Sequence, residues 1–137
     1  MHSLWFTLNN RLKYDIRRKE LEKTMTLIDE FTIQKTFVEW ARKQEFILLC
    51  FAVPNGFQSN RHNAIMMKRE GLLAGVPDVF CLLCNGKWAI IEFKTETGNV
   101  GFHQKAVMEK LKQGKQAVRV CRSTREAVLF VKEVLNA

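Results

Sequence analysis

The chain has 137 residues, about the length of one domain and enough for a single core of ordinary size. Its 22 lysines and arginines outnumber its 14 acidic residues, and the formal net charge of +8 makes a polyanion, above all nucleic acid, the natural partner. No run of about 18 apolar residues is present, so the sequence predicts neither a membrane span nor a secretory signal. We therefore expect a cytoplasmic or otherwise intracellular protein that is not secreted.

The N-terminal segment, residues 1–24, combines a basic bias with weak periodicity. An arm, an extra helix packed on a partner and a partly disordered stretch all remain open for it. We divide the chain into this segment and a compact domain over 25–137, which could begin at Met25. From Asp29 to Gln44, apolar residues recur at helical spacing behind Asp29 as a candidate N-cap, which predicts the first helix.

The rest of the chain alternates between strand and helix patterns. In chain order these are a strand at 46–53, a polar loop at 54–63, a short helix at 64–73, strands at 76–84 and 87–94, a helix at 102–113, a strand at 117–122 and a final helix behind a Ser123-x-x-Glu126 capping box. The unbroken apolar run at 46–53 predicts a strand covered on both faces. The order α-β-(α)-β-β-α-β-α predicts an α/β fold with a central mixed β-sheet flanked by helices.

Two registers are open to the hairpin formed around the Asn-Gly turn at 85–86. A two-residue turn puts Asp78 and Glu92 on opposite faces of the hairpin. A three-residue loop with Gly86 in the left-handed conformation pairs Leu83 with Lys87, and so sets Asp78 directly opposite Glu92. Because strand side chains alternate, this second register also places the lysine at 94 on the same face.

Two carboxylates about 5 Å apart repel each other, so they need a cation or a raised pKa. Mg²⁺ takes one or two carboxylates, keeps several waters and accepts phosphate oxygens, and Lys94 could hold a water or stabilise charge on a phosphate. This chemistry fits phosphodiester hydrolysis. The structural alternative is an ordinary ion pair between Glu92 and Lys94, with Asp78 capping a turn.

Pro77-Asp78 followed by Glu92-x-Lys94 resembles the signature of the PD-(D/E)xK nucleases. The fuller pattern resembles the VRR-NUC branch of that superfamily, from about Glu30 to the C-terminus. Its parts are Glu30 with Gln34, residues 68–71, residues 75–78, residues 91–94 and Gln104. The resemblance implies a restriction-endonuclease-like core.

By this resemblance, Asp78 and Glu92 would ligate Mg²⁺ or Mn²⁺ together with the backbone carbonyl of Phe93. Lys94 would position the attacking water, and Gln104 would support the site from its helix.

Glu30 would add a further ligand from the first helix. Glu39 is the rival for this role, but we favour Glu30 because it can pair with Gln34 one turn along. An exposed helical glutamate is the structural alternative for both.

Family members include stand-alone phage-type proteins similar to Holliday-junction resolvases, which work as symmetric dimers. The resemblance therefore implies a metal-dependent endonuclease that acts on branched or junction DNA as a homodimer. The alternatives are a non-catalytic nucleic-acid-binding module and a flap-specific, duplex-specific, restriction-type or RNA-directed nuclease on the same fold.

Basic residues beside the proposed site are candidates for phosphate contacts, against the alternative of a solvated surface. They are Arg61, Lys68, Arg69 and Lys105. His62 and His103 could assist proton transfer.

The four cysteines lie mostly in apolar runs, which predicts reduced, buried thiols. Half a zinc knuckle at Cys81 and Cys84 is the weaker alternative, because no second Cys-x-x-Cys pair is present.

Overall fold

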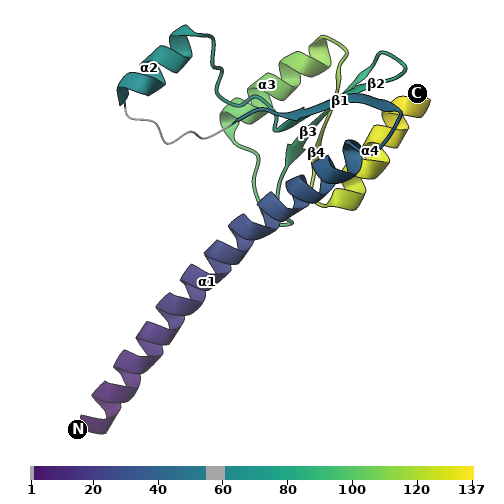
Figure 1. Cartoon of the computed structure of the whole chain (residues 1–137). Coiled ribbons are helices and arrows are strands. Elements are labelled where there is room, and N and C mark those ends of the chain that lie inside the picture. Colours follow the sequence, from purple (N-terminus) through teal and green to yellow (C-terminus); the bar gives the residue numbers. More distant parts are fainter. Residues whose placement is uncertain (1, 55–60) are drawn as a thin grey trace.

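The computed structural model describes residues 2–54 and 61–137, and within its helices the side chains at 2–6, 9, 22–29, 61 and 62 lie outside the described set. In chain order the elements are α1 (His2–Ala41), β1 (Ile47–Ala52), α2 (Arg61–Arg69), β2 (Val79–Leu83), β3 (Trp88–Phe93), α3 (Phe102–Gln113), β4 (Ala117–Cys121) and α4 (Thr124–Asn136). The predicted α/β order is confirmed (Figure 1).

A four-stranded mixed sheet in the order β1-β2-β3-β4 forms the centre of the fold. The strand β2 runs antiparallel to both of its neighbours, β1 and β3, whereas β3 and β4 are parallel. Parallel neighbours need a crossover connection, and α3 supplies it. The mixed sheet flanked by helices is therefore as predicted.

The main core lies on one face of the sheet, where the end of α1 and the whole of α4 pack. It joins Phe37 of α1 and Phe130 of α4 to inward-facing strand residues such as Ile91 and Phe93. Ile90 points to the other face, where Met108 of α3 is also buried. The two layers of helices thus enclose β3, the strand that carries Glu92.

The β2–β3 hairpin adopts the three-residue register. Val79 pairs with Ile91 and Leu82 with Trp88, so that Asp78, one residue before β2, comes level with Glu92. The Leu83 N–H donates to the Lys87 carbonyl at 2.9 Å, and the turn glycine at 86 has φ +81°. The left-handed glycine fixes which carboxylates face each other.

The first helix is longer than predicted. It runs without a break from His2, so the expected start with Asp29 as N-cap is wrong. Residues 2–41 contain neither glycine nor proline, and nothing in the local sequence stops the helix. Its N-terminal part projects from the rest of the molecule (Figure 1), with every side chain from 10 to 21 exposed. The division between residues 24 and 25 falls inside this helix and stays a prediction.

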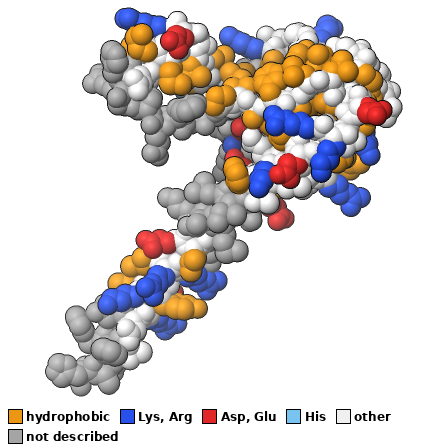
Figure 2. Space-filling model, in the orientation of Figure 1, with side chains coloured by type: hydrophobic (Ala, Val, Ile, Leu, Met, Phe, Trp, Pro, Cys, Tyr) orange, Lys and Arg blue, Asp and Glu red, His pale blue; other side chains and the backbone are white. Residues whose placement is uncertain are grey.

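The strand β1 is not covered on both faces, contrary to expectation. It lies at the edge of the sheet, and Leu48 and Leu49 are 63% and 49% exposed. Phe51 is also exposed and stacks on Phe80 with ring centroids 5.6 Å apart. Figure 2 shows hydrophobic side chains gathered over this part of the molecule. The unbroken apolar run at 46–53 therefore forms an edge strand with exposed apolar side chains.

The loop predicted at 54–63 is shorter at its C-terminal side, because α2 already begins at Arg61. Residues 55–60 lie outside the described residues. At the start of α4, Ser123 Oγ accepts the Glu126 N–H at 3.1 Å, which is one half of the predicted capping box. The Glu126 carboxylate instead accepts the N–H of Arg122, one residue before the cap.

Three of the four cysteines are buried, as expected, but Cys84 in the hairpin turn is exposed. No three His, Cys, Asp or Glu side chains group into a metal-holding cluster in the described part of the chain, so the zinc-knuckle alternative gains no support. None of the described helices is long and apolar enough to cross a membrane.

Candidate active site

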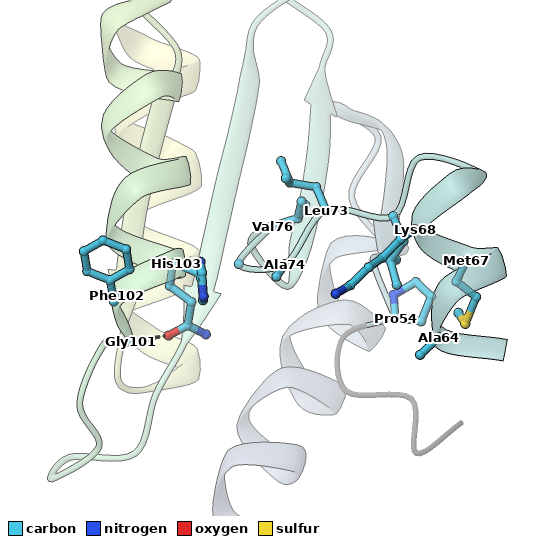
Figure 3. Close-up of a pocket in the computed structure, with 13 residues that line it drawn as sticks. Pro54, Ala64, Met67, Lys68, Leu73, Ala74, Val76, Gly101, Phe102 and His103 are labelled. Atoms are coloured by element: carbon cyan, nitrogen blue, oxygen red, sulfur yellow. Dashed lines mark hydrogen bonds between the residues drawn. The ribbon is translucent and has the colours of Figure 1, made fainter. Parts of the chain in front are cut away.

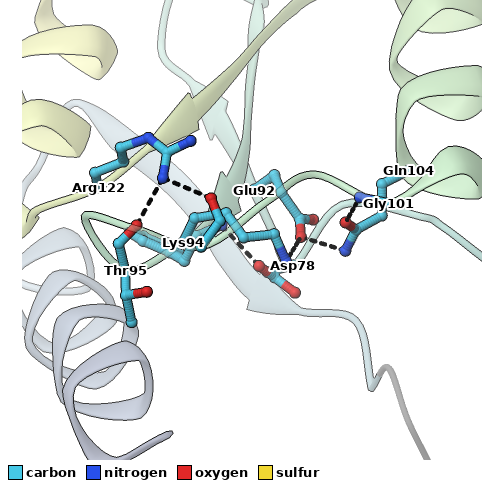
Figure 4. Close-up of polar contacts among 9 residues, drawn as sticks. Asp78, Glu92, Lys94, Thr95, Gly101, Gln104 and Arg122 are labelled. Atoms are coloured by element: carbon cyan, nitrogen blue, oxygen red, sulfur yellow. Dashed lines mark hydrogen bonds and ion pairs between the residues drawn. The ribbon is translucent and has the colours of Figure 1, made fainter. Parts of the chain in front are cut away.

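Two carboxylates meet where the β2–β3 hairpin opens (Figure 4). Glu92 is the next-to-last residue of β3 and is 1% exposed, while Asp78 directly precedes β2 and is half-buried. The Phe93 N–H donates to Asp78 Oδ2 at 2.7 Å, so the backbone of β3 orients this carboxylate. The two acidic groups predicted to converge do lie together.

Lys94 and Gln104 both contact the same oxygen of Glu92. The Lys94 ammonium lies 3.0 Å from Glu92 Oε1, and its own side chain is only 13% exposed. The Gln104 amide donates to the same oxygen at 2.5 Å, while its Oε1 accepts the Gly101 N–H at 2.8 Å. Gln104 thus ties the first turn of α3 to the carboxylate on β3.

The second carboxylate oxygen of Glu92 has a different environment. Among the described residues, Glu92 Oε2 is buried and has no hydrogen-bond partner. A buried carboxylate oxygen without a partner carries a substantial desolvation cost. This atom is where a bound cation would make up a missing interaction.

Burial raises the pKa of Glu92 to about 7. The negative charge of Asp78 adds to this rise, while the hydrogen bond and positive charge of Lys94 oppose it. The charge of Glu30 on α1 also raises the Glu92 pKa, so the helix brings its carboxylate within electrostatic reach of the site. Glu39, the rival residue, is exposed further along α1.

The residues present fit a hard divalent cation. Asp78 and Glu92 provide two carboxylates, which is what Mg²⁺ commonly takes from a protein alongside waters and phosphate oxygens. The orphaned Glu92 Oε2 supports this match. Glu30 and the backbone carbonyl of Phe93 remain predicted ligands.

The predicted phosphate-binding residues lie on two helices beside the site. Lys68 and Arg69 are exposed at the end of α2, and Lys105 is exposed next to Gln104 on α3. Lys68 and Gln104 line the same cavity. The Arg61 and His62 side chains lie outside the described residues, whereas His103 is exposed and lines that cavity too.

Arg122 is a supporting residue that the sequence did not reveal. Its Nη1 atom donates to the carbonyls of Thr95, Glu96 and Gly98 at 2.7, 3.2 and 2.7 Å (Figure 4). These carbonyls belong to the segment that joins Lys94 to α3. One arginine at the end of β4 therefore holds the connection between two parts of the site, and no local sequence signal marks such a contact.

Gly75 is a second supporting residue whose role was missed. Its φ is +88°, and a Cβ there would lie 2.4 Å from the backbone carbonyl of His103 and 2.7 Å from the Gln104 nitrogen. The loop before β2 and the first turn of α3 therefore touch through their backbones. This glycine is part of the sequence pattern at 75–78, but the close approach of its backbone to α3 depends on the tertiary fold.

Comparisons with known proteins identify the fold and the family of the chain. The chain resembles a solved structure described as a VRR_NUC domain protein, with a TM-score of 0.65, 19% sequence identity, and coverage of 78% of this chain and 88% of that one. No curated protein sequence matches the chain. The family model for the VRR-NUC domain matches residues 16–125. The fold and this match over most of the sequence show that the chain belongs to the VRR-NUC family of nuclease domains.

Proposed function

We propose that the chain is a metal-dependent endonuclease that hydrolyses phosphodiester bonds in DNA. The observation that carries the proposal is the state of Glu92, a buried carboxylate that faces Asp78 and keeps one oxygen without a hydrogen-bond partner among the described residues. Paired carboxylates beside a single ammonium leave negative charge that a divalent cation would neutralise. Membership of a nuclease family points to the same chemistry.

Asp78 and Glu92 would hold Mg²⁺ or Mn²⁺, assisted by Glu30 and the backbone carbonyl of Phe93. When bound, such an ion would supply positive charge that polarises a phosphoryl oxygen and stabilises charge developing at the phosphorus. The Phe93 N–H keeps the Asp78 carboxylate in its orientation. Preorganised ligands of this kind lower the cost of assembling the site.

Lys94 would hold the attacking water and stabilise negative charge beside it. Its ammonium is already fixed by the ion pair with Glu92, and little of its side chain is exposed. Gln104 keeps Glu92 Oε1 occupied, so that Oε2 is the oxygen available for a cation. The contacts of these residues with Glu92 support the proposed roles.

DNA would lie across α2 and α3. Lys68 and Arg69 are exposed at the end of α2, where Arg61 is the first residue, and Lys105 is exposed on α3 next to Gln104. Lysine and arginine contacts to phosphates supply affinity without reading sequence. We expect binding that weakens steeply with added salt.

We propose further that the enzyme acts on branched DNA, such as a four-way junction, as a homodimer. Two copies related by a two-fold axis would present two sites to a pair of symmetric strands. The exposed apolar surface of β1, with Leu48, Leu49 and Phe51, offers a face that a second copy could cover.

The decisive experiment compares Asp78→Asn with Asp15→Asn, which makes the same chemical change at an exposed position on α1. Labelled four-way junction, flap, duplex, single-stranded DNA and RNA are incubated with Mg²⁺, Mn²⁺ or EDTA, and the mass of the protein in solution is measured in parallel. Wild type and Asp15→Asn should cut DNA only with a divalent ion. Asp78→Asn should bind the same DNA without cutting it.

Cleavage that survives EDTA or Asp78→Asn would contradict the proposal. Binding of DNA by the wild type without cleavage under any of these conditions would favour a non-catalytic binding module. Preferential cleavage of RNA, flap or duplex would assign a different substrate. Full junction cleavage by a protein with a monomeric mass would contradict the proposed homodimer.

A further inference from the structure

A cavity of about 420 Å³ lies between α2, the loop before β2 and the first turn of α3 (Figure 3). Most of its wall is apolar, with contributions from Met67, Leu72, Leu73 and Val76. Its volume is within the range of pockets that enclose small organic groups. The roles proposed above for the site leave this space unused.

Gln104 links the cavity to the carboxylates. This side chain lines the cavity and also donates a hydrogen bond to Glu92 Oε1. A group in the cavity would therefore lie next to whatever is held at Glu92. If a phosphodiester is cut there, the neighbouring group is the adjoining nucleotide of the same strand.

The wall chemistry matches a nucleobase. The apolar surfaces would pack against the flat faces of a base, while Lys68 extends toward the space from α2 and His103 lies on the α3 side (Figure 3). Lys68 could contact the attached phosphate, and His103 could hydrogen-bond a base edge. Phe102, which also lines the cavity, is 81% exposed and can be covered at little desolvation cost to polar groups.

We infer that this cavity receives one unpaired nucleobase next to the scissile phosphate. A base that is stacked and paired in a duplex must first be unpaired and unstacked to enter a pocket, at a cost of a few kcal/mol, whereas one at a branch, gap or single-stranded end enters without breaking a pair. The cavity thereby gives a physical cause for selecting discontinuous DNA. This inference rests on the proposed nuclease function and adds the part of the substrate that the enzyme recognises.

The test combines cavity-filling variants with removal of the base. Ala74 lines the cavity and is exposed, so Ala74→Phe would fill the space from the loop. Ala64→Phe fills it from α2 and serves as a second variant if the first does not fold. Ala106→Phe adds the same bulk on α3 at an exposed position outside the cavity and is the matched control. Circular dichroism checks the folding of each variant.

Affinity is measured without divalent ions on branched DNA with intact nucleotides and on DNA made abasic at each position around the cut found with wild type. Wild type should bind the intact DNA about tenfold more tightly than the abasic DNA at one position, as expected for packing a single base. Either filling variant should abolish this ratio, and Ala106→Phe should keep it. A 2-aminopurine at that position should change its fluorescence on binding wild type but not the filling variants.

Two kinds of failure are distinguishable. If wild type binds and cleaves DNA but shows no dependence on any single base, or if the filled variants keep the ratio, the inference is overturned while the nuclease function stands. The cavity would then take another group, such as an apolar side chain of a protein. If wild type neither binds nor cleaves DNA, the proposed function and the inference both fail.

Discussion

The two ends of the β2–β3 hairpin differ in how fully their polar side chains are hydrogen-bonded. At the turn, the Asn85 amide donates to the carbonyls of Val134 and Leu135 at 3.2 Å each, and the Lys87 ammonium donates to the carbonyl of Ala137 at 2.7 Å. These carbonyls belong to the C-terminal end of α4, and the last carbonyls of a helix have no hydrogen-bond donor within the helix. Each of these interactions therefore supplies a hydrogen-bond donor to a carbonyl at the end of the helix.

At the open end, the carboxylates of Glu92 and Asp78 crowd together, and one buried oxygen stays without a hydrogen-bond partner among the described residues. The same pair of strands thus has hydrogen-bonded polar side chains at the turn, whereas at the open end Glu92 Oε2 has no partner among the described residues. Polar groups that a fold leaves unsatisfied at a cost in stability are candidates for binding something outside the chain. The following predictions separate the two ends.

The largest difference should appear between two lysines of this hairpin. Lys94→Met removes the ammonium beside Glu92, and the rate of single-turnover DNA cleavage should fall about 10³-fold because charge at the reacting centre loses its stabilisation. Lys87→Met, at the turn, should change the rate less than about twofold, since the hydrogen bond of its ammonium goes to the carbonyl of Ala137 at the end of α4. Equal losses for both variants would show that the ends do not differ in function.

The next effect is on stability, and it depends on pH. The pKa of Glu92 is raised to about 7 by burial, so the folded protein holds this proton more tightly than the unfolded chain, where the usual value is 4.5. The free energy of unfolding should therefore fall as pH rises from about 4.5 to 7, by about 3 kcal/mol in total, and stay reduced above 7. Glu92→Gln should remove this loss and be more stable than wild type at pH 8.

Urea unfolding in EDTA, from pH 4.5 to 8.5, measures this difference. Glu133→Gln is the control, because Glu133 is 59% exposed, pairs with Arg119 at the surface, and should show little of the same pH dependence. A Glu92→Gln variant that is less stable than wild type at pH 8 would mean that the carboxylate is satisfied in the folded protein.

Two glycines with positive φ give a third test. Gly75→Ala and Gly71→Ala should each lose about 1 kcal/mol of stability from left-handed backbone strain. Only the methyl group at 75 meets the backbone of α3, whereas nothing lies within 4 Å of one at 71. Gly75→Ala should therefore displace Gln104 and lower the cleavage rate about tenfold or more, a loss that Gly71→Ala should not show. Parallel losses of activity would place the cause in strain alone.

The smallest effect belongs to the turn. Asn85→Ala removes the amide that donates to Val134 and Leu135, and should cost about 1 kcal/mol of stability without changing cleavage. Thermal unfolding and the cleavage assay together check both parts. A loss of activity at unchanged stability would contradict the separation between the two ends.

Local rules predicted the hairpin and narrowed its pairing to two registers. Because side chains alternate strictly along a strand, counting from the three-residue loop places Asp78, Glu92 and Lys94 together, and the structure adopts this register with Gly86 in the left-handed conformation. Their catalytic and metal-binding roles stay predictions. The geometry places these groups together but does not by itself show a reaction.

Features that depend on tertiary neighbours could not be predicted in this way. The exposure of β1 depends on which strand ends the sheet and where α3 lies, and its apolar pattern is the same in either case. The Arg122 contacts join residues 24 to 27 positions apart, and the close approach at Gly75 joins the loop before β2 to the first turn of α3. The first helix was predicted too short, because Asp29 resembled an N-cap within a segment that is helical without interruption.

The exposed thiol of Cys84 offers a practical way to follow how DNA binds to this protein. The other three cysteines are buried, so a maleimide dye should attach at this single position in the folded protein. Cys84 is a strand length, about 20 Å, from the open end of the hairpin. Energy transfer between such a dye and a labelled DNA arm would report which way the substrate enters.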